Sequence, residues 1–155
     1  MQKLIVLDIS PRAYPQRHIE IIDALNNLDV ANVASRADAS SLLEKQGIEH
    51  QTTAFLLKNL ARDKSGAYYW RMNLTSLTNN YPNILREISS VTPFPNPTRF
   101  FRGENSNYIS SVDESQITSL FPLAEVSTLP DSGHWVHVDS PKLLMAKVRQ
   151  FLKDT

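Results

Sequence analysis

The sequence predicts an α/β protein in which a few-stranded, mostly parallel sheet is interrupted by an inserted block of helices. An apolar run over residues 3–8, closed by Asp8, is typical of a strand in a parallel sheet, buried on both faces. Helical spacing of apolar residues, without a convincing strand, fills residues 16–90. From residue 98 onward short strands alternate with helices, an order that implies parallel strands joined by helical crossovers.

Composition excludes several classes of protein. A chain of 155 residues, 41% hydrophobic and 21% charged, is long enough for one sizeable core and typical of a soluble globular protein. Sixteen basic and sixteen acidic residues balance, which argues against a nucleic-acid-binding protein. Because the chain has no Cys, it cannot form a disulfide or a zinc–thiolate site. No apolar run reaches the length of a signal-peptide core or a membrane span, so we expect a soluble, cytoplasmic protein.

The chain is expected to divide into three parts. Residues 1–12 hold the first core strand, residues 13–92 the helical insertion and residues 93–155 the carboxy-terminal α/β part, which begins at a cluster of prolines. Five helices are expected in the insertion, marked by Ile19, Ile22, Ala24 and Leu25; by Leu42 and Leu43, with a stop at Gly47; by Phe55, Leu56, Leu57 and Leu60; by Leu74, Leu77 and Tyr81; and by Pro82, which starts a short helix with Ile84, Leu85 and Ile88 inward.

The carboxy-terminal part shows strand and helix signals in alternation. A strand over 98–102 is ended by Gly103, and a second strand covers 124–129 after a short helix over 116–121. Pro141 opens a final helix with an apolar stripe of Leu143, Leu144, Val148, Phe151 and Leu152. Three parallel strands are few for such a sheet, and the first would form a long apolar edge, which proteins usually avoid. We therefore expect a complementing amino-terminal segment, or self-association, along that edge.

Several short motifs, in order along the chain, together carry a family resemblance. They are Val6-Leu7-Asp8-Ile9-Ser10-Pro11, Phe55-Leu56-Leu57-Lys58-Asn59-Leu60, Trp70-Arg71-Met72-Asn73-Leu74, Pro97-Thr98, Gly103-Glu104-Asn105-Ser106 and Gly133-His134-Trp135-Val136-His137. In these motifs the chain resembles the carboxy-terminal portion of the YbfF-like esterase family of α/β hydrolases. The resemblance implies a partial α/β-hydrolase fold in which the helical insertion is a cap. It also implies serine-dependent cleavage of short acyl esters or thioesters.

His134 is the candidate general base. A Gly-His pair between a strand and a closing amphipathic helix is similar to the catalytic histidine loop of α/β hydrolases, whose triad runs in the chain order Ser, acid, His. In that role the imidazole takes a proton from a serine hydroxyl and returns it to the leaving alcohol or thiol. The plainer interpretation is an ordinary loop histidine.

Two carboxylates are candidates for the acid that orients His134. Many α/β hydrolases carry the acid in the loop that here reads Gly-Glu-Asn-Ser-Asn, where Glu104 is the only carboxylate and Ser106 stands about where an Asp is expected. The resemblance instead implies an acid one strand earlier, at Asp8. We favour Asp8 over Glu104, although Asp8 could also be a plain strand-end turn residue.

The nucleophile is missing from the sequence. Its four glycines include no pair four residues apart, so the nucleophile motif G-x-S-x-G is absent. Ser10, Ser106 and Ser132 all lack the small flanking residues of a nucleophile elbow. We expect a fragment or half-enzyme whose nucleophile lies outside this chain. The alternatives are a non-catalytic module that binds an acyl ligand or a protein, and other reactions, such as dehalogenation or lyase chemistry, on the same fold.

Four residues are weaker candidates for a substrate pocket: Trp135, Trp70, Arg71 and Ser106. For Trp70 and Arg71, packing between helices and a surface ion pair are the favoured interpretation. No cofactor is expected. A metal is not expected either, because the four His residues lack clustered ligand spacing.

Overall fold

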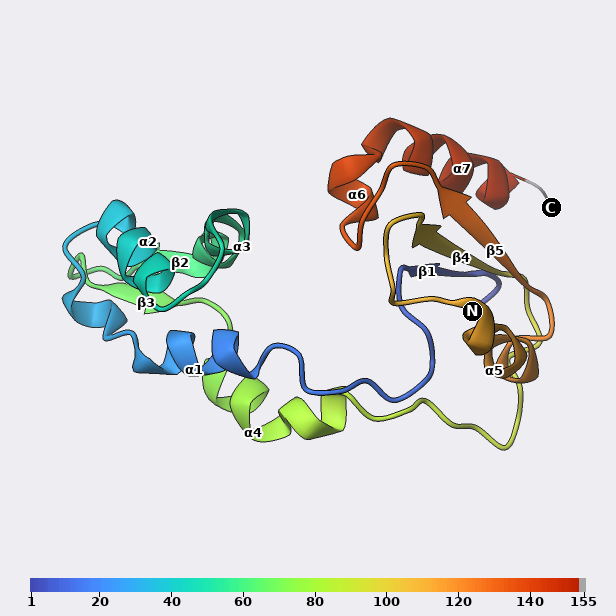
Figure 1. Cartoon of the computed structure of the whole chain (residues 1–155), viewed down its shortest axis with the longest axis horizontal. Helices are drawn as coiled ribbons and strands as arrows, with labels where there is room; N and C mark the ends of the chain where they lie inside the picture. The colour runs from blue at the N-terminus through green and yellow to red at the C-terminus, as the bar shows by residue number, and fades with distance from the viewer. Residues whose placement is uncertain (154–155) are drawn as a thin grey trace. The chain divides into compact units, whose positions relative to one another are not determined.

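The computed structural model describes residues 1–153, and it divides the chain into two compact units. Unit 1 combines residues 1–13 with the chain from Glu87 onward, and unit 2 comprises residues 14–86. Figure 1 shows the elements of both units along the chain.

The sheet of unit 1 is parallel and has three strands. These are β1 (Leu4–Leu7), β4 (Thr98–Gly103) and β5 (Ala124–Leu129), in the spatial order β1-β4-β5. Leu7 lies opposite Phe101, and Phe101 lies opposite Ser127, so the three strands end at a common edge. The structure confirms the expected small parallel sheet. The expectation that the first strand is buried on both faces is wrong, because β1 is an edge strand and the side chain of Leu7 is exposed.

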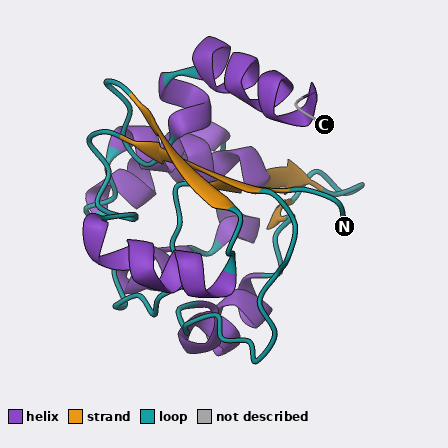
Figure 2. Ribbon diagram, turned by 90° about the vertical axis from the view of Figure 1, so that its right-hand side faces the viewer, coloured by secondary structure: helices purple, strands orange, loops and turns teal. Residues whose placement is uncertain are grey.

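Helices cover both faces of this sheet. The helices of unit 1 are the 3-10 helix η3 (Ser111–Asp113), α5 (Glu114–Leu120), α6 (Val136–Asp139) and α7 (Pro141–Lys153). Because side chains alternate along a strand, Phe101 packs with α6 and α7, whereas Phe100 packs with Ile117 of α5. Figures 1 and 2 show α7, which leads to the carboxy terminus, lying along one face of the sheet. The predicted stripe of α7 is partly wrong, because Leu143 and Leu152 are exposed.

Unit 2 is mainly helical. Its elements are α1 (Ile19–Asn27), η1 (Val30–Asn32), α2 (Arg36–Lys45), α3 (His50–Leu56), η2 (Leu57–Asn59), β2 (Leu60–Arg62), β3 (Tyr68–Trp70) and α4 (Leu74–Ile84). Ser35 is the N-cap of α2, and its side chain accepts a hydrogen bond from the Asp38 N–H. After the helix ends, the chain turns at Gly47, which has φ of +89°. The stop predicted at Gly47 is therefore confirmed.

The structure corrects the helical insertion at two places. Strands β2 and β3 form an antiparallel hairpin, with Leu60 opposite Trp70, in a segment for which no strand was expected. These strands have only three residues each, too few to show an alternating pattern. Pro82 does not start a fifth helix but lies inside α4, where it cannot donate the i→i−4 hydrogen bond of a helical residue. Ile84 and Ile88, expected to point inward, are exposed.

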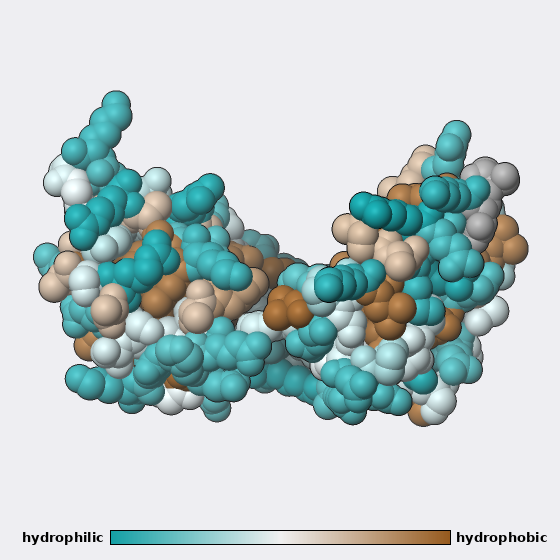
Figure 3. Space-filling model, turned by 90° about the horizontal axis from the view of Figure 1, so that it is seen from above, coloured by the Kyte–Doolittle hydropathy of each residue, from teal (hydrophilic) through white to brown (hydrophobic). Residues whose placement is uncertain are grey.

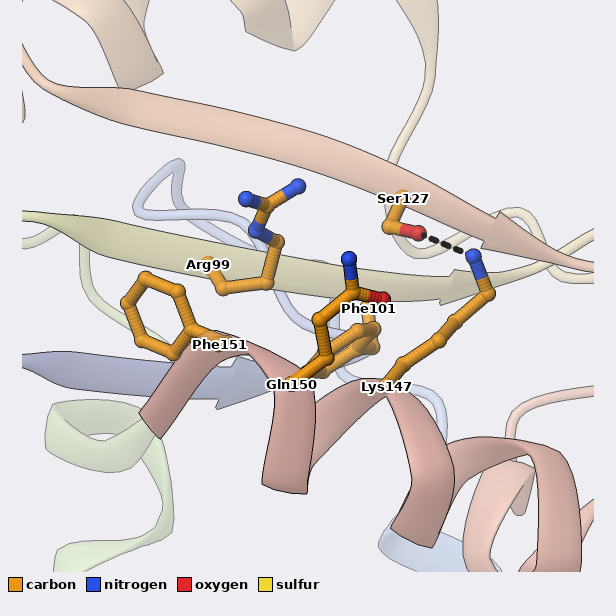
Figure 4. Close-up of a pocket in the computed structure, with 6 residues that line it drawn as sticks. All are labelled: Arg99, Phe101, Ser127, Lys147, Gln150 and Phe151. Carbon is orange, nitrogen blue, oxygen red and sulfur yellow. Dashed lines mark hydrogen bonds between the residues drawn. The ribbon is translucent and has the colours of Figure 1, made fainter. Parts of the chain in front are cut away.

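The packing of α7 on the sheet leaves a cavity of about 210 Å³ (Figure 4). It is lined by Arg99, Phe101, Ser127, Lys147, Gln150 and Phe151. Its two cationic side chains have partners: the Lys147 ammonium donates to Ser127 Oγ at 3.2 Å, and Arg99 forms an ion pair with Glu125 at 2.7 Å. These contacts tie the helix and the two strands together.

In the face seen in Figure 3, hydrophilic residues dominate, with hydrophobic ones between them. Within residues 1–153, no helix has the length and apolar character needed to cross a membrane.

Replacing Phe101 by Ala is expected to lower the free energy of unfolding of unit 1 by about 3–5 kcal/mol, because its ring is 1% exposed and fills the contact between the sheet and α7. Urea denaturation monitored by amide exchange of the β4 residues measures this. Leu123→Ala is the control, since Leu123 is 56% exposed and its removal should change the stability by less than about 0.5 kcal/mol. Equal effects of the two substitutions would contradict the packing described here.

Candidate functional site

Three loops meet at the carboxyl edge of the sheet in unit 1. The chain leaves β1 at Asp8, β4 at Gly103 and β5 at Leu129, and in parallel sheets this edge is where ligands bind. Asp8 adopts a left-handed backbone conformation, with φ of +46°, and its N–H still bonds to the Phe101 carbonyl at 2.8 Å. This turn directs the chain away from the sheet directly after the carboxylate, whose residue is fully buried.

The Asp8 carboxylate accepts hydrogen bonds from three groups, two at the end of β4 and one in the loop after β5. Its Oδ1 accepts from the Gly103 N–H at 2.9 Å. Its Oδ2 accepts from the Ser106 hydroxyl and lies 2.8 Å from His134 Nδ1. A buried carboxylate requires such partners, because an uncompensated charge away from water is costly. Asp8 therefore joins the ends of β1 and β4 to the loop after β5.

The imidazole of His134 is oriented from its edge and from its face. The Asp8 contact at Nδ1 favours the tautomer with a proton on Nδ1, which leaves Nε2 as the acceptor. Among the described residues 1–153, none is hydrogen-bonded to Nε2. The ring of Tyr108 stacks on the imidazole, with centroids 3.8 Å apart and planes 15° apart. The His134 side chain is 41% exposed, so Asp8 and Tyr108 hold a ring that can still be reached from solvent.

The loop that carries His134 is held by its own polar contacts. The Gly133 N–H donates to the Asp139 carboxylate at 2.8 Å. The buried Ser132 hydroxyl bonds to the Pro130 carbonyl at 3.2 Å and to the Ser140 hydroxyl at 2.8 Å. Trp135 occupies the N-cap position of α6, directly before its first residue. The loop thus presents His134 from a fixed backbone.

Gly103 leaves room for the His134 loop. A Cβ at this position would lie 2.1 Å from the Gly133 carbonyl oxygen and 2.5 Å from that of Ser132. No side chain fits at these distances, so the approach of the two loops requires glycine at 103. The same residue donates to Asp8, so both the acid and the histidine loop depend on it.

An ion pair between the partly exposed Arg12 and the buried Asp113, which could not be foreseen from the sequence, supports the loop after β4. Arg12 Nε lies 2.9 Å from Asp113 Oδ1, and Arg12 Nη2 donates to the Asn107 carbonyl at 3.3 Å. Burial by itself raises the pKa of Asp113. Hydrogen bonds from the backbone and side chain of Ser110, then from Ser10, and the charge of Arg12 outweigh it and hold this pKa below its usual value. The Ser110-x-x-Asp113 spacing of a capping box was the available signal for Asp113 alone.

The other predicted residues lie as follows. Ser106 contacts Asp8, and Trp135 follows His134. Glu104, the alternative acid, accepts from the Asp131 N–H at 3.0 Å, and it is Asp8 that the structure brings to His134. Trp70 and Arg71 belong to unit 2, where Trp70 pairs with Leu60 in the hairpin and Arg71 donates its N–H to the Asn59 carbonyl. Within residues 1–153, no three His, Asp or Glu side chains gather closely enough to hold a metal.

Comparison with known proteins places the fold in a class. The parallel sheet, with helices on both faces and an Asp–His pair at its carboxyl edge, defines a partial α/β-hydrolase fold. A solved marine microorganism esterase has the same fold with a TM-score of 0.92 and is 35% identical, over 97% of this chain and 60% of the esterase. An M. tuberculosis esterase, 20% identical with a TM-score of 0.63, shares the fold. No family model matches the sequence.

Curated relatives agree with the family resemblance. Esterase YbfF of Escherichia coli is 29% identical over 99% of this chain and 59% of its own length. The sn-1-specific diacylglycerol lipase ABHD11 of Danio rerio and a putative esterase/lipase of Haemophilus influenzae are each 35% identical, over 99% and 98% of this chain. The chain corresponds to a portion of the YbfF-like α/β hydrolases, which confirms the resemblance. It spans about half the length of the curated relatives that it matches.

Gly103→Ala is expected to separate Asp8 from His134, because the new methyl group would occupy the space of the Gly133 carbonyl. In the wild type the hydrogen bond to Asp8 protects the Nδ1 proton of His134 from exchange with water. In Gly103→Ala this proton should exchange rapidly, so its signal should disappear from the proton NMR spectrum. Leu123→Ala is the control, since Leu123 is 56% exposed and belongs to the same unit without taking part in the site. A persistent Nδ1–H signal in Gly103→Ala would contradict the close approach.

Asp113 is expected to make unit 1 sensitive to acid. Its pKa lies below the usual 3.8 in the folded protein, so the unfolded chain binds the proton more readily. The stabilisation is therefore present above about pH 4 and is lost as the pH falls through the folded-state pKa. As the pH is lowered from 6 to 2, the urea midpoint of unfolding should fall less steeply for Asp113→Asn than for the wild type. Asp23→Asn, an exposed carboxylate in unit 2, should leave the slope unchanged.

Proposed function

We propose that this chain supplies the acid and the general base of a serine hydrolase that cleaves short acyl esters or thioesters. The observation that carries the proposal is the 2.8 Å contact between the buried Asp8 carboxylate and His134 Nδ1 at the carboxyl edge of the sheet. An orienting carboxylate on one imidazole nitrogen, with the other nitrogen available, is the arrangement that a catalytic triad needs. The esterase and lipase names of the relatives support the reaction class.

The proposed mechanism assigns one task to each group. His134 Nε2 removes the proton of a serine hydroxyl while the serine oxygen attacks the acyl carbonyl. The resulting imidazolium is stabilised by Asp8, which accepts the hydrogen bond of the Nδ1–H group while the proton stays on Nδ1. Nε2 then returns its proton to the leaving alcohol or thiol, which leaves an acyl-enzyme. Water, activated in the same way, attacks the acyl group and releases the acid and the serine.

The nucleophilic serine is proposed to come from outside this chain. The three serines considered above are buried or engaged: Ser106 donates to Asp8, Ser132 is buried and bonded to Pro130 and Ser140, and Ser10 is buried beside Asp113. None stands in a G-x-S-x-G motif, which the sequence lacks. A complementing amino-terminal segment would place its last strand along the edge of β1, on the side away from β4. The alternative is that a second copy of this chain pairs along the same edge.

The substrate pocket is proposed to lie beside the Asp8–His134 pair. Trp135 is half-buried directly after the base and is a candidate to contact the acyl group. The helical unit 2, which contains Trp70 and Arg71, is proposed as the cap that the family resemblance implies. Its core forms within the unit, as expected for an insertion that folds as one body.

A second function, favoured by the missing elbow, is that of a non-catalytic module that binds an acyl ligand or another protein. It uses the same fold without the hydrolytic step. The exposed Leu7 and Ile9 at the end of the edge strand would then belong to a binding surface.

Fluorophosphonate labelling, read by intact mass and peptide mapping, tests the proposed function. The chain alone should give no adduct. Mixed with the part of the marine esterase that it does not match, and after size-exclusion chromatography shows association, the pair should be labelled on a serine of the added segment. Asp8→Asn should slow this labelling by about 10⁴-fold, and His134→Ala should abolish it. His137→Ala, an exposed histidine three residues away, is the matched control and should label normally.

Two results would contradict the proposal. A stoichiometric adduct on the chain alone would locate the nucleophile within it. An associated pair that labels equally well with Asp8→Asn and His134→Ala would remove the role of the Asp–His pair. Association without any labelling would favour the binding module.

A further inference from the structure

We propose that Tyr108 is a positioning residue that fixes the orientation of the His134 imidazole toward Asp8. The catalytic consequence of this role rests on the proposed hydrolase function, but the role itself does not. Neither the sequence motifs nor the names of the relatives point to this tyrosine. The inference comes from its direct contact with His134 and its link to Asp8 through Ser106.

The first contact is the stack of the two rings. The centroids of Tyr108 and His134 lie 3.8 Å apart and the planes are within 15° of parallel. The hydrogen bond to Asp8 restrains the imidazole at one atom of its edge, Nδ1, but does not by itself prevent the ring from tilting out of plane. A flat aromatic surface against the face opposes that tilt. The two restraints are therefore complementary, which matters for a side chain that is 41% exposed.

The second contact reaches Asp8 through one intervening residue. The backbone N–H of Tyr108 donates to Ser106 Oγ at 3.2 Å, and the Ser106 hydroxyl donates to Asp8 Oδ2. The same carboxylate oxygen binds His134 Nδ1. Tyr108 thus closes a ring of contacts in which its backbone orders the acid and its side chain orders the base. Displacement of this residue would loosen both partners at once.

The core of unit 1 holds Tyr108 in place. The next residue, Ile109, is 2% exposed and packs with Phe100 and Ile117 on the α5 face of the sheet. The preceding residue, Asn107, has its carbonyl held by Arg12, which also pairs with Asp113. With anchors on both sides, the tyrosine ring is presented to His134 by a fixed backbone. A mobile surface ring would give far less orientation.

The chemistry gives the face contact a use during turnover. When Nε2 accepts a proton, the ring becomes a cation, and the π-face of an aromatic ring attracts a cation placed over it. The benefit needs the aromatic ring and not the phenolic hydroxyl. Phenylalanine at position 108 should therefore preserve the role, whereas leucine, of similar apolar character without a π-system, should remove it.

NMR on the chain itself tests this proposal, with Tyr108→Leu and Tyr108→Phe as the matched pair of variants. In the wild type the ring current of Tyr108 should shift the carbon-bound protons of the His134 imidazole upfield. Tyr108→Leu should abolish that displacement and speed exchange of the Nδ1 proton about three- to tenfold, as expected for loss of one aromatic contact. Tyr108→Phe should retain both signatures. Tyr69→Leu, an exposed tyrosine of unit 2, should change neither.

Amide spectra that match the wild type away from the site show that each variant is folded. Unchanged His134 signals in Tyr108→Leu, or equal losses in the Leu and Phe variants, would overturn the proposal. The result is independent of hydrolysis: if the stack signatures hold but the complemented wild type is never labelled, the proposed function fails and the positioning role stands. If labelling succeeds, Tyr108→Leu should slow it and Tyr108→Phe should not.

Discussion

The buried carboxylate of Asp8 is the interaction on which the rest of the site depends. It lies at the end of β1, in a left-handed backbone conformation, and receives the Gly103 N–H, the Ser106 hydroxyl and His134 Nδ1. A charge with no exposure to water is tolerated only when such donors surround it. Three loops must therefore converge for this residue to be buried, and their convergence is what orients the imidazole.

A second constraint is the absence of a side chain at Gly103. The loop after β5 passes so close to this residue that its carbonyl groups occupy the position of a Cβ. Glycine thus serves the site in two ways, by donating its N–H to the acid and by admitting the loop that carries the histidine. The acid and the base are linked through backbone geometry as well as through their own hydrogen bond.

The packing of the sheet supplies the rigidity that these contacts need. Phe100 and Phe101 are adjacent in β4 but pack on opposite faces, one against α5 and the other against α6 and α7. The α5 face also buries Ile109, and so orders the loop that carries Ser106 and Tyr108. The loop after β4 is therefore anchored at Ile109, and the loop after β5 lies between the core residues Leu129 and Val136, which holds their polar groups at fixed distances.

The α/β class, the parallel strands over 98–102 and 124–129, the final helix and the family resemblance could be predicted from the sequence alone, because these depend on local periodicity and on motifs. The sequence also singled out Asp8 and His134 as candidates. Only the tertiary structure decided that these two meet, that Ser106 and Tyr108 join them and that Arg12 pairs with Asp113, since residues as much as 126 positions apart come together through the sheet. The hairpin of unit 2 and the exposure of Ile84 likewise escaped prediction. Three-residue strands carry no readable alternation, and the spacing of apolar residues does not reveal which face of a helix finds a partner.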